Sequence, residues 1–130
     1  MNRVIVENIT QLSSVKLYDF QHVADSDYLQ FKLDLKNPFF HVVTISGMNS
    51  DEFTDFKENL NLMLNQQKQN ISLNPLGEFW IVEFCKVEDG IEVKGDISDR
   101  LFPQNNLRFR FIVCWDCLKE LGNQIDSLFV

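Results

Sequence analysis

The sequence predicts a single α+β domain, residues 1–130, in which a mainly antiparallel β-sheet packs with a central helix and a C-terminal helix. Its 130 residues are 45% hydrophobic and 24% charged, which is the size and balance of one soluble globular domain. Apolar residues alternate with polar ones in most segments and recur at helical spacing in two. Because the expected strands are grouped around two helices, without regular alternation, antiparallel pairing is favoured.

The N-terminal part of the chain is rich in strand patterns. Short β-prone runs occur at Arg3–Ile9 and Val15–Phe20, and Tyr28–Leu35 alternates cleanly between apolar and polar residues, as a half-buried strand does. A turn follows at Asn37-Pro38. The next run, Phe39–Gly47, is apolar on both faces, and this predicts a strand in the interior of a sheet.

A helix is expected after Gly47, where the spacing of apolar residues changes from every second residue to the helical period. Asn49, followed three residues later by Glu52, is typical of a capping box, and Asp51 adds negative charge at the positive end of the helix dipole. The apolar stripe consists of Phe53, Phe56, Leu60, Met63 and Leu64.

Strands resume in the second half of the chain, after irregular segments at Gln66–Asn70 and Asn74–Gly77. Glu78–Val87 alternates, and Glu88-Asp89-Gly90 predicts a hairpin turn into the next strand, which contains Ile91, Val93 and Ile97. The two strands are therefore expected to pair antiparallel.

The last part of the chain predicts a loop, a strand and a helix. The loop at Ser98–Asn106 contains a proline, and Leu107–Trp115 has the clearest alternation in the sequence. Asp116 is the expected N-cap of the final helix, which Gly122 weakens by about 1 kcal/mol relative to alanine. Its apolar stripe is Leu118, Leu121, Ile125 and Leu128. The predicted order is four strands, a helix, three or four strands and a helix, with no internal sequence repeat.

The charge of the chain limits the classes of partner. Nineteen acidic and twelve basic residues give a net charge of −7, which repels nucleic-acid phosphates and anionic membrane surfaces. A basic protein is the expected partner. No apolar run has the length of a secretory signal or of a membrane span, and the three cysteines are an odd number. We expect a cytoplasmic protein without a disulfide framework.

One motif has catalytic precedent, the pair of cysteines in Cys114-Trp115-Asp116-Cys117. A thiol at the N-terminus of a helix has a lowered pKa and is reactive. A thioredoxin-like site also needs a βαβ context, whereas residues 118–130 are expected to form a single helix. We interpret both cysteines as structural, with Cys114 facing inward at the end of its strand, and keep a thiol oxidoreductase as an alternative function.

Other residues of catalytic or ligand-binding type do not form a recognised pattern. Cys85, His22 and His41 lack the spacing of a second zinc half-site, and the familiar nucleophile, phosphate-binding and dinucleotide motifs are absent from the sequence. Arg108 and Arg110 share one face of a strand, and we expect them to be either solvated or paired across the sheet. The sequence therefore predicts no enzyme activity, no metal and no cofactor.

The distribution of acidic residues suggests a binding surface. Residues 51–100 contain eleven acids and five bases, so most of the excess charge lies in the middle of the chain. If the fold gathers these acids, they can attract a basic partner. Trp80 or Tyr28 is a possible aromatic anchor if exposed. The candidate partner-binding residues are Asp51, Glu52, Asp55, Glu58, Glu88, Asp89, Glu92, Asp96 and Asp99.

Over residues 26–130 the chain resembles the WapI-type immunity proteins of bacterial polymorphic-toxin and contact-dependent growth inhibition systems. The resemblance rests on the alternating strand at Tyr28–Leu33, the leucine-containing central helix, the segment Ile71–Leu76, the passage Phe111–Leu118 and the ending Leu128-Phe129. It implies a non-catalytic cytoplasmic protein that binds a cognate toxin domain, often a nuclease, and blocks it.

We therefore expect an immunity protein that neutralises a basic toxin domain through an acidic surface. An acidic protein suits this task because nuclease clefts are built to accept phosphate charge. A second alternative, besides the thiol oxidoreductase, is a small ligand-binding or adaptor domain of a secretion system. An enclosed apolar pocket would favour that alternative over a flat acidic face.

Overall fold

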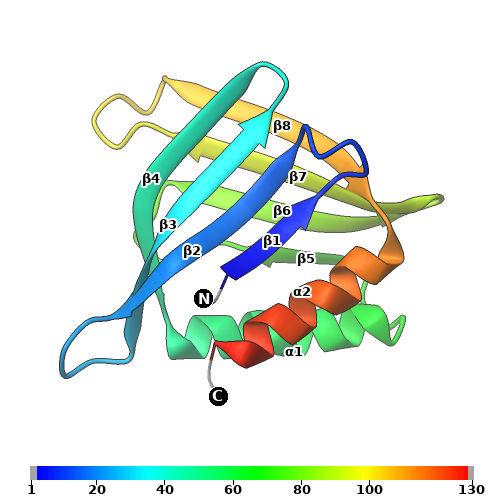
Figure 1. Cartoon of the computed structure of the whole chain (residues 1–130), viewed down its shortest axis with the longest axis horizontal. Coiled ribbons are helices and arrows are strands. Elements are labelled where there is room, and N and C mark those ends of the chain that lie inside the picture. The colour runs from blue at the N-terminus through cyan, green and yellow to red at the C-terminus, as the bar shows by residue number, and fades with distance from the viewer. Residues whose placement is uncertain (1–2, 129–130) are drawn as a thin grey trace.

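The computed structural model describes residues 3–128 and contains two successive units of the same kind, each a four-stranded antiparallel sheet followed by a helix (Figure 1). The first unit is β1 (Arg3–Glu7), β2 (Ser14–His22), β3 (Tyr28–Asn37), β4 (Phe40–Asn49) and α1 (Ser50–Leu64). The second is β5 (Asn70–Leu73), β6 (Trp80–Val87), β7 (Gly90–Ser98), β8 (Asn106–Val113) and α2 (Trp115–Ser127). The predicted α+β class with antiparallel pairing is confirmed, but the strands form two sheets and not the one sheet that was expected.

The structure has an internal repeat that the sequence does not display. The strand orders are β1-β2-β3-β4 and β5-β6-β7-β8, so each sheet is a simple meander. The sequence predicts no strand at the position of β5, which contributes only Ile71 and Leu73 to the core. Four residues are too few for an alternating pattern to stand out beside the polar segment that precedes them.

The two sheets face each other across a core that is rich in phenylalanine. Phe31 of β3 lies with its ring centroid 6.1 Å from that of Phe53 of α1 and 6.5 Å from that of Trp80 of β6, both in edge-on geometry. Phe56 of α1 and Phe84 of β6 approach to 5.7 Å. Such contacts add to the stabilisation from burial. They join both sheets and the central helix into one hydrophobic cluster.

The helices cover one pair of sheet edges and leave the other pair open. α2 packs against β1 and α1, and α1 packs against β5. The Gln124 side chain accepts a 2.9 Å hydrogen bond from the Ile5 amide, so α2 also satisfies a backbone donor of β1. Within the described residues, β4 and β8 each have a paired strand on one side only. Figure 1 shows both helices lying below the sheets, on the side of β1 and β5.

Several local predictions are confirmed. Asn49 and Glu52 form the capping box of α1, with the Asn49 amide donating to the Glu52 carboxylate over 3.1 Å. The turn at Glu88-Asp89 joins β6 and β7 as an antiparallel hairpin.

Three local predictions are wrong. β4 is an edge strand and not an interior strand. The N-cap of α2 is Cys114 and not Asp116, which lies in the first turn of the helix. Cys114 is exposed and does not face inward, because the strand pattern stops at Val113 and the chain turns there into the helix.

No helix in residues 3–128 has the length and apolar character that a membrane crossing requires.

Candidate functional site

The edge strand β4 has apolar side chains on a surface that nothing covers in the described structure. Val43 is 50% exposed and Ile45 is 60% exposed. They lie opposite Asp34 and Lys32 of β3. In an antiparallel edge strand every second residue also points its N–H and C=O groups away from the sheet. β4 therefore presents apolar side chains together with unpaired backbone donors and acceptors.

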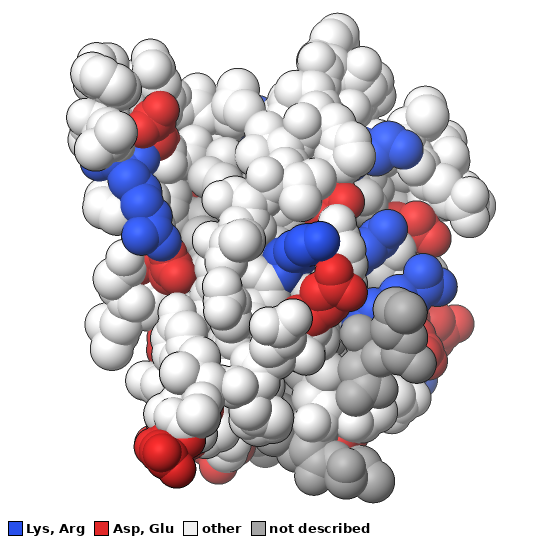
Figure 2. Space-filling view, turned by 60° about the vertical axis from the view of Figure 1, so that its left-hand side comes forward, with Lys and Arg blue, Asp and Glu red and all other residues white. Residues whose placement is uncertain are grey.

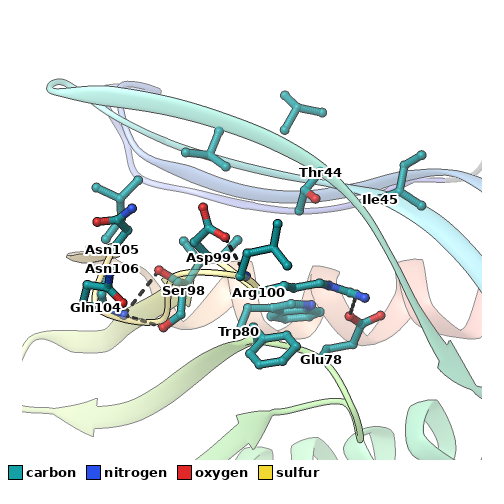
Figure 3. A pocket seen from close by; sticks show the side chains of 16 residues that line it. Thr44, Ile45, Glu78, Trp80, Ser98, Asp99, Arg100, Gln104, Asn105 and Asn106 are labelled. Atoms are coloured by element: carbon teal, nitrogen blue, oxygen red, sulfur yellow. Dashed lines mark hydrogen bonds and ion pairs between the residues drawn. The ribbon is translucent and has the colours of Figure 1, made fainter.

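A cleft of about 930 Å³ adjoins this strand. One wall is β4 from Val42 to Ile45, and the other is formed by residues 78–80 and by the β7–β8 connection. Figure 3 shows Thr44 and Ile45 on the β4 side, with Trp80, Arg100 and Asn106 on the opposite side. The cleft thus lies between the open edge of the first sheet and the second sheet.

Trp80 forms the buried floor of the cleft. Its side chain is 4% exposed, and its indole N–H donates a 2.8 Å hydrogen bond to the hydroxyl oxygen of Ser46, a buried residue of β4. This bond crosses from β6 to β4 and fixes the distance between the two walls. An aromatic floor with a satisfied polar atom gives the cleft a rigid apolar base.

An ion pair lies at the side of the cleft. The Arg100 guanidinium pairs with the Glu78 carboxylate, whose side chain is 8% exposed, and it also lies 5.6 Å from the centre of the Phe79 ring. The pKa of Tyr28 is raised, first by burial and then by the negative charges of Glu78 and Glu52. This ion pair is part of a cleft lining in which polar and apolar residues are mixed.

The connection between β7 and β8 is held by its own hydrogen bonds. The Asp99 carboxylate accepts from the amides of Leu101, over 2.8 Å, and of Phe102, over 3.2 Å. The Asn106 side chain donates to the Ser98 hydroxyl over 3.0 Å. The loop nevertheless leaves Leu101 82% exposed and Phe102 54% exposed. The hydrogen-bonded backbone of this loop therefore holds the apolar side chains of Leu101 and Phe102 in contact with solvent.

Several of the exposed apolar residues line the cleft. The lining includes the partly or largely exposed residues Val43, Ile45, Phe79, Leu101 and Leu107. Figure 2 shows the face of the molecule on the β4 side, where a band of uncharged residues lies between charged side chains at the left margin and a group of basic and acidic side chains right of the centre. An uncharged band bordered by charged groups is compatible with a binding site.

The structure does not bring the nine predicted acidic residues together. Glu88 and Asp89 precede β7 and Asp99 follows it, so this nine-residue strand separates them by roughly 25–30 Å. Asp51, Glu52, Asp55 and Glu58 lie on α1. In Figure 1 the β6–β7 turn and the beginning of α1 are on opposite sides of the molecule. The acids are distributed over three regions and do not form one patch.

Four of these acids also have local structural partners. Glu92 lies 3.7 Å from Arg110 and 3.8 Å from Lys94. Asp96 lies 3.2 Å from Arg108. Asp99 accepts loop amides, and Glu52 caps α1 and accepts from the Leu76 amide over 2.9 Å. The five others, which are exposed, are Asp51, Asp55, Glu58, Glu88 and Asp89.

Other residues considered in the sequence have local roles. Arg108 and Arg110 have the expected cross-strand acidic partners on β7. The His41 ring lies 2.8 Å from the nearly buried carboxylate of Asp34, across the β3–β4 pair. His22 ends β2 and pairs with a residue of β3. Within residues 3–128 there is no cluster of three or more potential metal ligands.

The candidate aromatic anchors behave differently from each other. Trp80 is buried and serves as the floor of the cleft, so it is not an exposed anchor. Tyr28 is partly exposed, and its ring covers Gly47 of β4. The apolar residues of β4 itself were not among the sequence candidates. The sequence signal for these residues was the apolar pattern on both faces of the strand, and that pattern predicted a strand buried inside a sheet.

No protein-family model matches the chain, and none of the curated proteins does. A chain from crystal structures of Trypanosoma brucei MRP1/MRP2 is similar in structure, with a TM-score of 0.54 and 7% sequence identity. The alignment covers 96% of this chain and 80% of that one. At this identity the similarity shows the fold alone.

Proposed function

We propose that this chain is an immunity protein that binds a cognate toxin domain and that its contact surface is the cleft beside β4. The observation that carries the proposal is the exposed apolar edge strand, with Val43 and Ile45 at 50% and 60% exposure. A strand of this kind is an aggregation hazard in a protein that binds nothing. A binding partner that covers β4 would explain why the protein keeps this exposed apolar edge strand.

The proposed occupant is an extended segment of the toxin domain that adds to the edge of β4. Unpaired backbone groups of an edge strand bind another strand, and neighbouring side chains give specificity. Here the specificity would come from Val43 and Ile45 on one side and from Phe79 and Leu101 on the other. The Trp80–Ser46 hydrogen bond holds both walls in place before binding, which lowers the ordering cost.

The acidic residues have a supporting role in this proposal. The net charge of −7 increases the association rate with a basic toxin domain even when the charges lie outside the contact. The proposed contact is therefore apolar and backbone-mediated. The acids act through the overall field of the molecule and not as a docking patch.

A bacterial protection assay tests this function. The chain is co-expressed with the toxin domain encoded beside its gene, and cell survival and complex formation are measured. Protection is expected for the unchanged protein. Val43→Lys and Ile45→Lys are expected to abolish protection, because each places a charge on the apolar edge. Ile112→Lys is the matched control, since Ile112 is 46% exposed on β8 and does not line the cleft.

Two outcomes would contradict the proposal. Absence of protection by the unchanged protein would reject the immunity function. Protection that survives both β4 substitutions and is lost on Glu88→Lys with Asp89→Lys would move the contact to the β6–β7 turn. Circular dichroism of each variant separates loss of binding from loss of folding.

A second candidate function is the binding of a small ligand. The cleft volume of about 930 Å³ lies in the range of small-molecule sites. The Glu78–Arg100 pair is among the polar groups of the lining that would orient a ligand. A fragment library can be added to the protein while the NMR chemical shifts of its residues are followed. Chemical-shift changes confined to cleft residues, together with no protection in the cell assay, would favour this candidate.

A further inference from the structure

The two cysteines at the start of α2 are in contact with each other. The sulfur atoms of Cys114 and Cys117 lie 3.2 Å apart, and both residues are free thiols. Cys114 is the N-cap residue of α2, and the Cys117 amide donates to its carbonyl oxygen over 3.1 Å. A disulfide has an S–S distance of about 2.05 Å. The sulfurs therefore need to approach by only about 1 Å to form a bond.

The two thiols differ in access and in acidity. Cys114 is exposed, whereas Cys117 is half-buried. The pKa of Cys114 is lowered, because the Cys117 thiol and then backbone N–H groups hydrogen-bond to its sulfur. Burial raises the pKa of Cys117. A solvent-facing thiol with a lowered pKa beside a protected thiol is the arrangement of an attacking and a resolving cysteine.

We propose that Cys114 and Cys117 form a dithiol that small-molecule disulfides, such as glutathione disulfide, oxidise reversibly to an intramolecular disulfide. The Cys114 thiolate attacks one sulfur of the small disulfide, forms a mixed disulfide and expels one thiolate. Cys117 then loses its proton to solvent and attacks the Cys114 sulfur, expelling the second thiolate. Two protein thiols are oxidised, and one small disulfide is reduced to two thiols.

This site is separate from the cleft beside β4. Leu107, which lines the cleft, is near the beginning of β8, and Cys114 directly follows the end of that strand. Figure 1 shows α2 starting at the side of the molecule opposite β4. The proposed oxidation therefore does not depend on the proposed toxin binding, and its test does not use a partner.

The environment of the pair permits the reaction without unfolding α2. Buried Leu118, Leu121 and Ile125 keep the helix on the core after its first turn. Trp115 lies between the cysteines in sequence, and Lys86 lies 5.7 Å from the centre of its ring. Asp116 opposes the thiolate forms of both cysteines. At Cys114 the hydrogen bonds from the Cys117 thiol and from the backbone outweigh that effect.

The test uses the purified chain in buffers with different ratios of reduced to oxidised glutathione. Intact-mass measurement after alkylation distinguishes free thiols, a glutathione adduct and an internal disulfide. We expect the unchanged protein to lose two hydrogens and two alkylation sites, with no lasting adduct. Cys117→Ser should accumulate a glutathione adduct on Cys114. Cys114→Ser should react at least about tenfold more slowly than Cys117→Ser, because its remaining thiols lack the lowered pKa.

Cys85→Ser is the matched control, since Cys85 is a half-buried thiol on β6 and should have no effect on disulfide formation. Circular dichroism establishes that each variant is folded. A lasting adduct on the unchanged protein equal to that on Cys117→Ser would overturn the proposal. Equal reaction rates for Cys114→Ser and Cys117→Ser would overturn it as well.

Discussion

The indole N–H of Trp80 donates a 2.8 Å hydrogen bond to the hydroxyl oxygen of Ser46, and this bond joins the two sheets at the bottom of the cleft. Both residues are buried, with exposed fractions of 4% and 3%. A buried indole N–H that loses its acceptor is costly, because no water replaces the bond. The pair therefore determines both the stability of the sheet junction and the geometry of the proposed contact surface.

Ser46→Ala is expected to lower the free energy of unfolding by about 1–3 kcal/mol, the cost of an unsatisfied buried donor. Trp80→Phe removes the donor and some packing, and the double variant should lose less than the sum of the two single variants. Urea denaturation of the four proteins measures this coupling. Additive losses would show that the hydrogen bond does not contribute.

A second prediction concerns Gly47 and the aromatic ring that covers it. A Cβ atom at Gly47 would lie 2.3 Å from atoms of the Tyr28 ring. Gly47→Ala should therefore destabilise the protein by about 1–3 kcal/mol through overpacking. In a Tyr28→Ala background the same substitution should cost much less, because the ring is gone. Thermal denaturation of the single and double variants tests this, and an equal cost in both backgrounds would contradict it.

The Tyr28 phenol also gives a pH-dependent prediction. Its pKa is raised by burial and by the charges of Glu78 and Glu52. Since the neutral form is favoured in the folded protein, this contribution to stability is present below the ordinary tyrosine pKa of about 10 and is lost as pH rises through the folded value. Glu78→Gln should move the pKa of Tyr28 downward.

The tyrosinate absorbance measures this shift. The chain has two tyrosines, so a Tyr18→Phe background isolates Tyr28. Glu83→Gln is the charge-matched control, because Glu83 lies on β6 and does not contribute to the Tyr28 shift. An unchanged titration on Glu78→Gln, or an equal change on Glu83→Gln, would show that Glu78 does not act on the phenol.

Much of the fold could be predicted because local patterns and tertiary packing agree. The Asn49–Glu52 capping box and the Glu88-Asp89 turn are short-range signals, and both are present in the structure. The sequence does not predict β5, because its extended shape depends on pairing with β6, which lies several residues later in the chain. A four-residue segment carries little of that information by itself.

The candidate site could not be predicted in the same way. An apolar residue such as Ile45 gives the same sequence signal whether a second strand or a binding partner covers it. The sequence therefore favoured an interior strand for β4, and only the strand order reveals an edge. For the acidic residues, closeness in the sequence suggested a closeness in space that the fold does not provide. Asp89 and Asp99 are close in sequence, but an extended strand separates them.

A fourth prediction follows from the two roles of Glu52. One carboxylate oxygen accepts from the Asn49 amide over 3.1 Å, and the other accepts from the Leu76 amide over 2.9 Å. Glu52→Ala should cost about 1–2 kcal/mol, the upper range for loss of a helix cap. Glu58→Ala, on an exposed position of α1, should change the stability by less than about 0.5 kcal/mol. Equal effects in chemical denaturation would contradict the structural role of Glu52.

The last prediction concerns Gly122, where sequence and structure suggest different effects. Glycine weakens a helix by about 1 kcal/mol relative to alanine, so Gly122→Ala would be expected to stabilise α2 by that amount. In the structure, however, the Lys57 ammonium donates a 3.0 Å hydrogen bond to the Gly122 carbonyl oxygen. An added Cβ would lie 3.2 Å from the Lys57 nitrogen and 3.4 Å from Leu60. The ammonium end of the Lys57 side chain would therefore have to move to make room for the added methyl group.

Gly122→Ala should therefore gain less than about 1 kcal/mol in the natural background. In a Lys57→Met background there is no ammonium group next to the added methyl group. The gain in the free energy of unfolding should then approach the full difference in helix propensity between glycine and alanine. Asp126→Ala removes only the exposed partner of Lys57, at 2.8 Å, and should cost less than about 1 kcal/mol. Denaturation curves of these variants decide the matter. The same gain in both backgrounds would mean that the close approach of Lys57 to α2 does not limit the residue at this position.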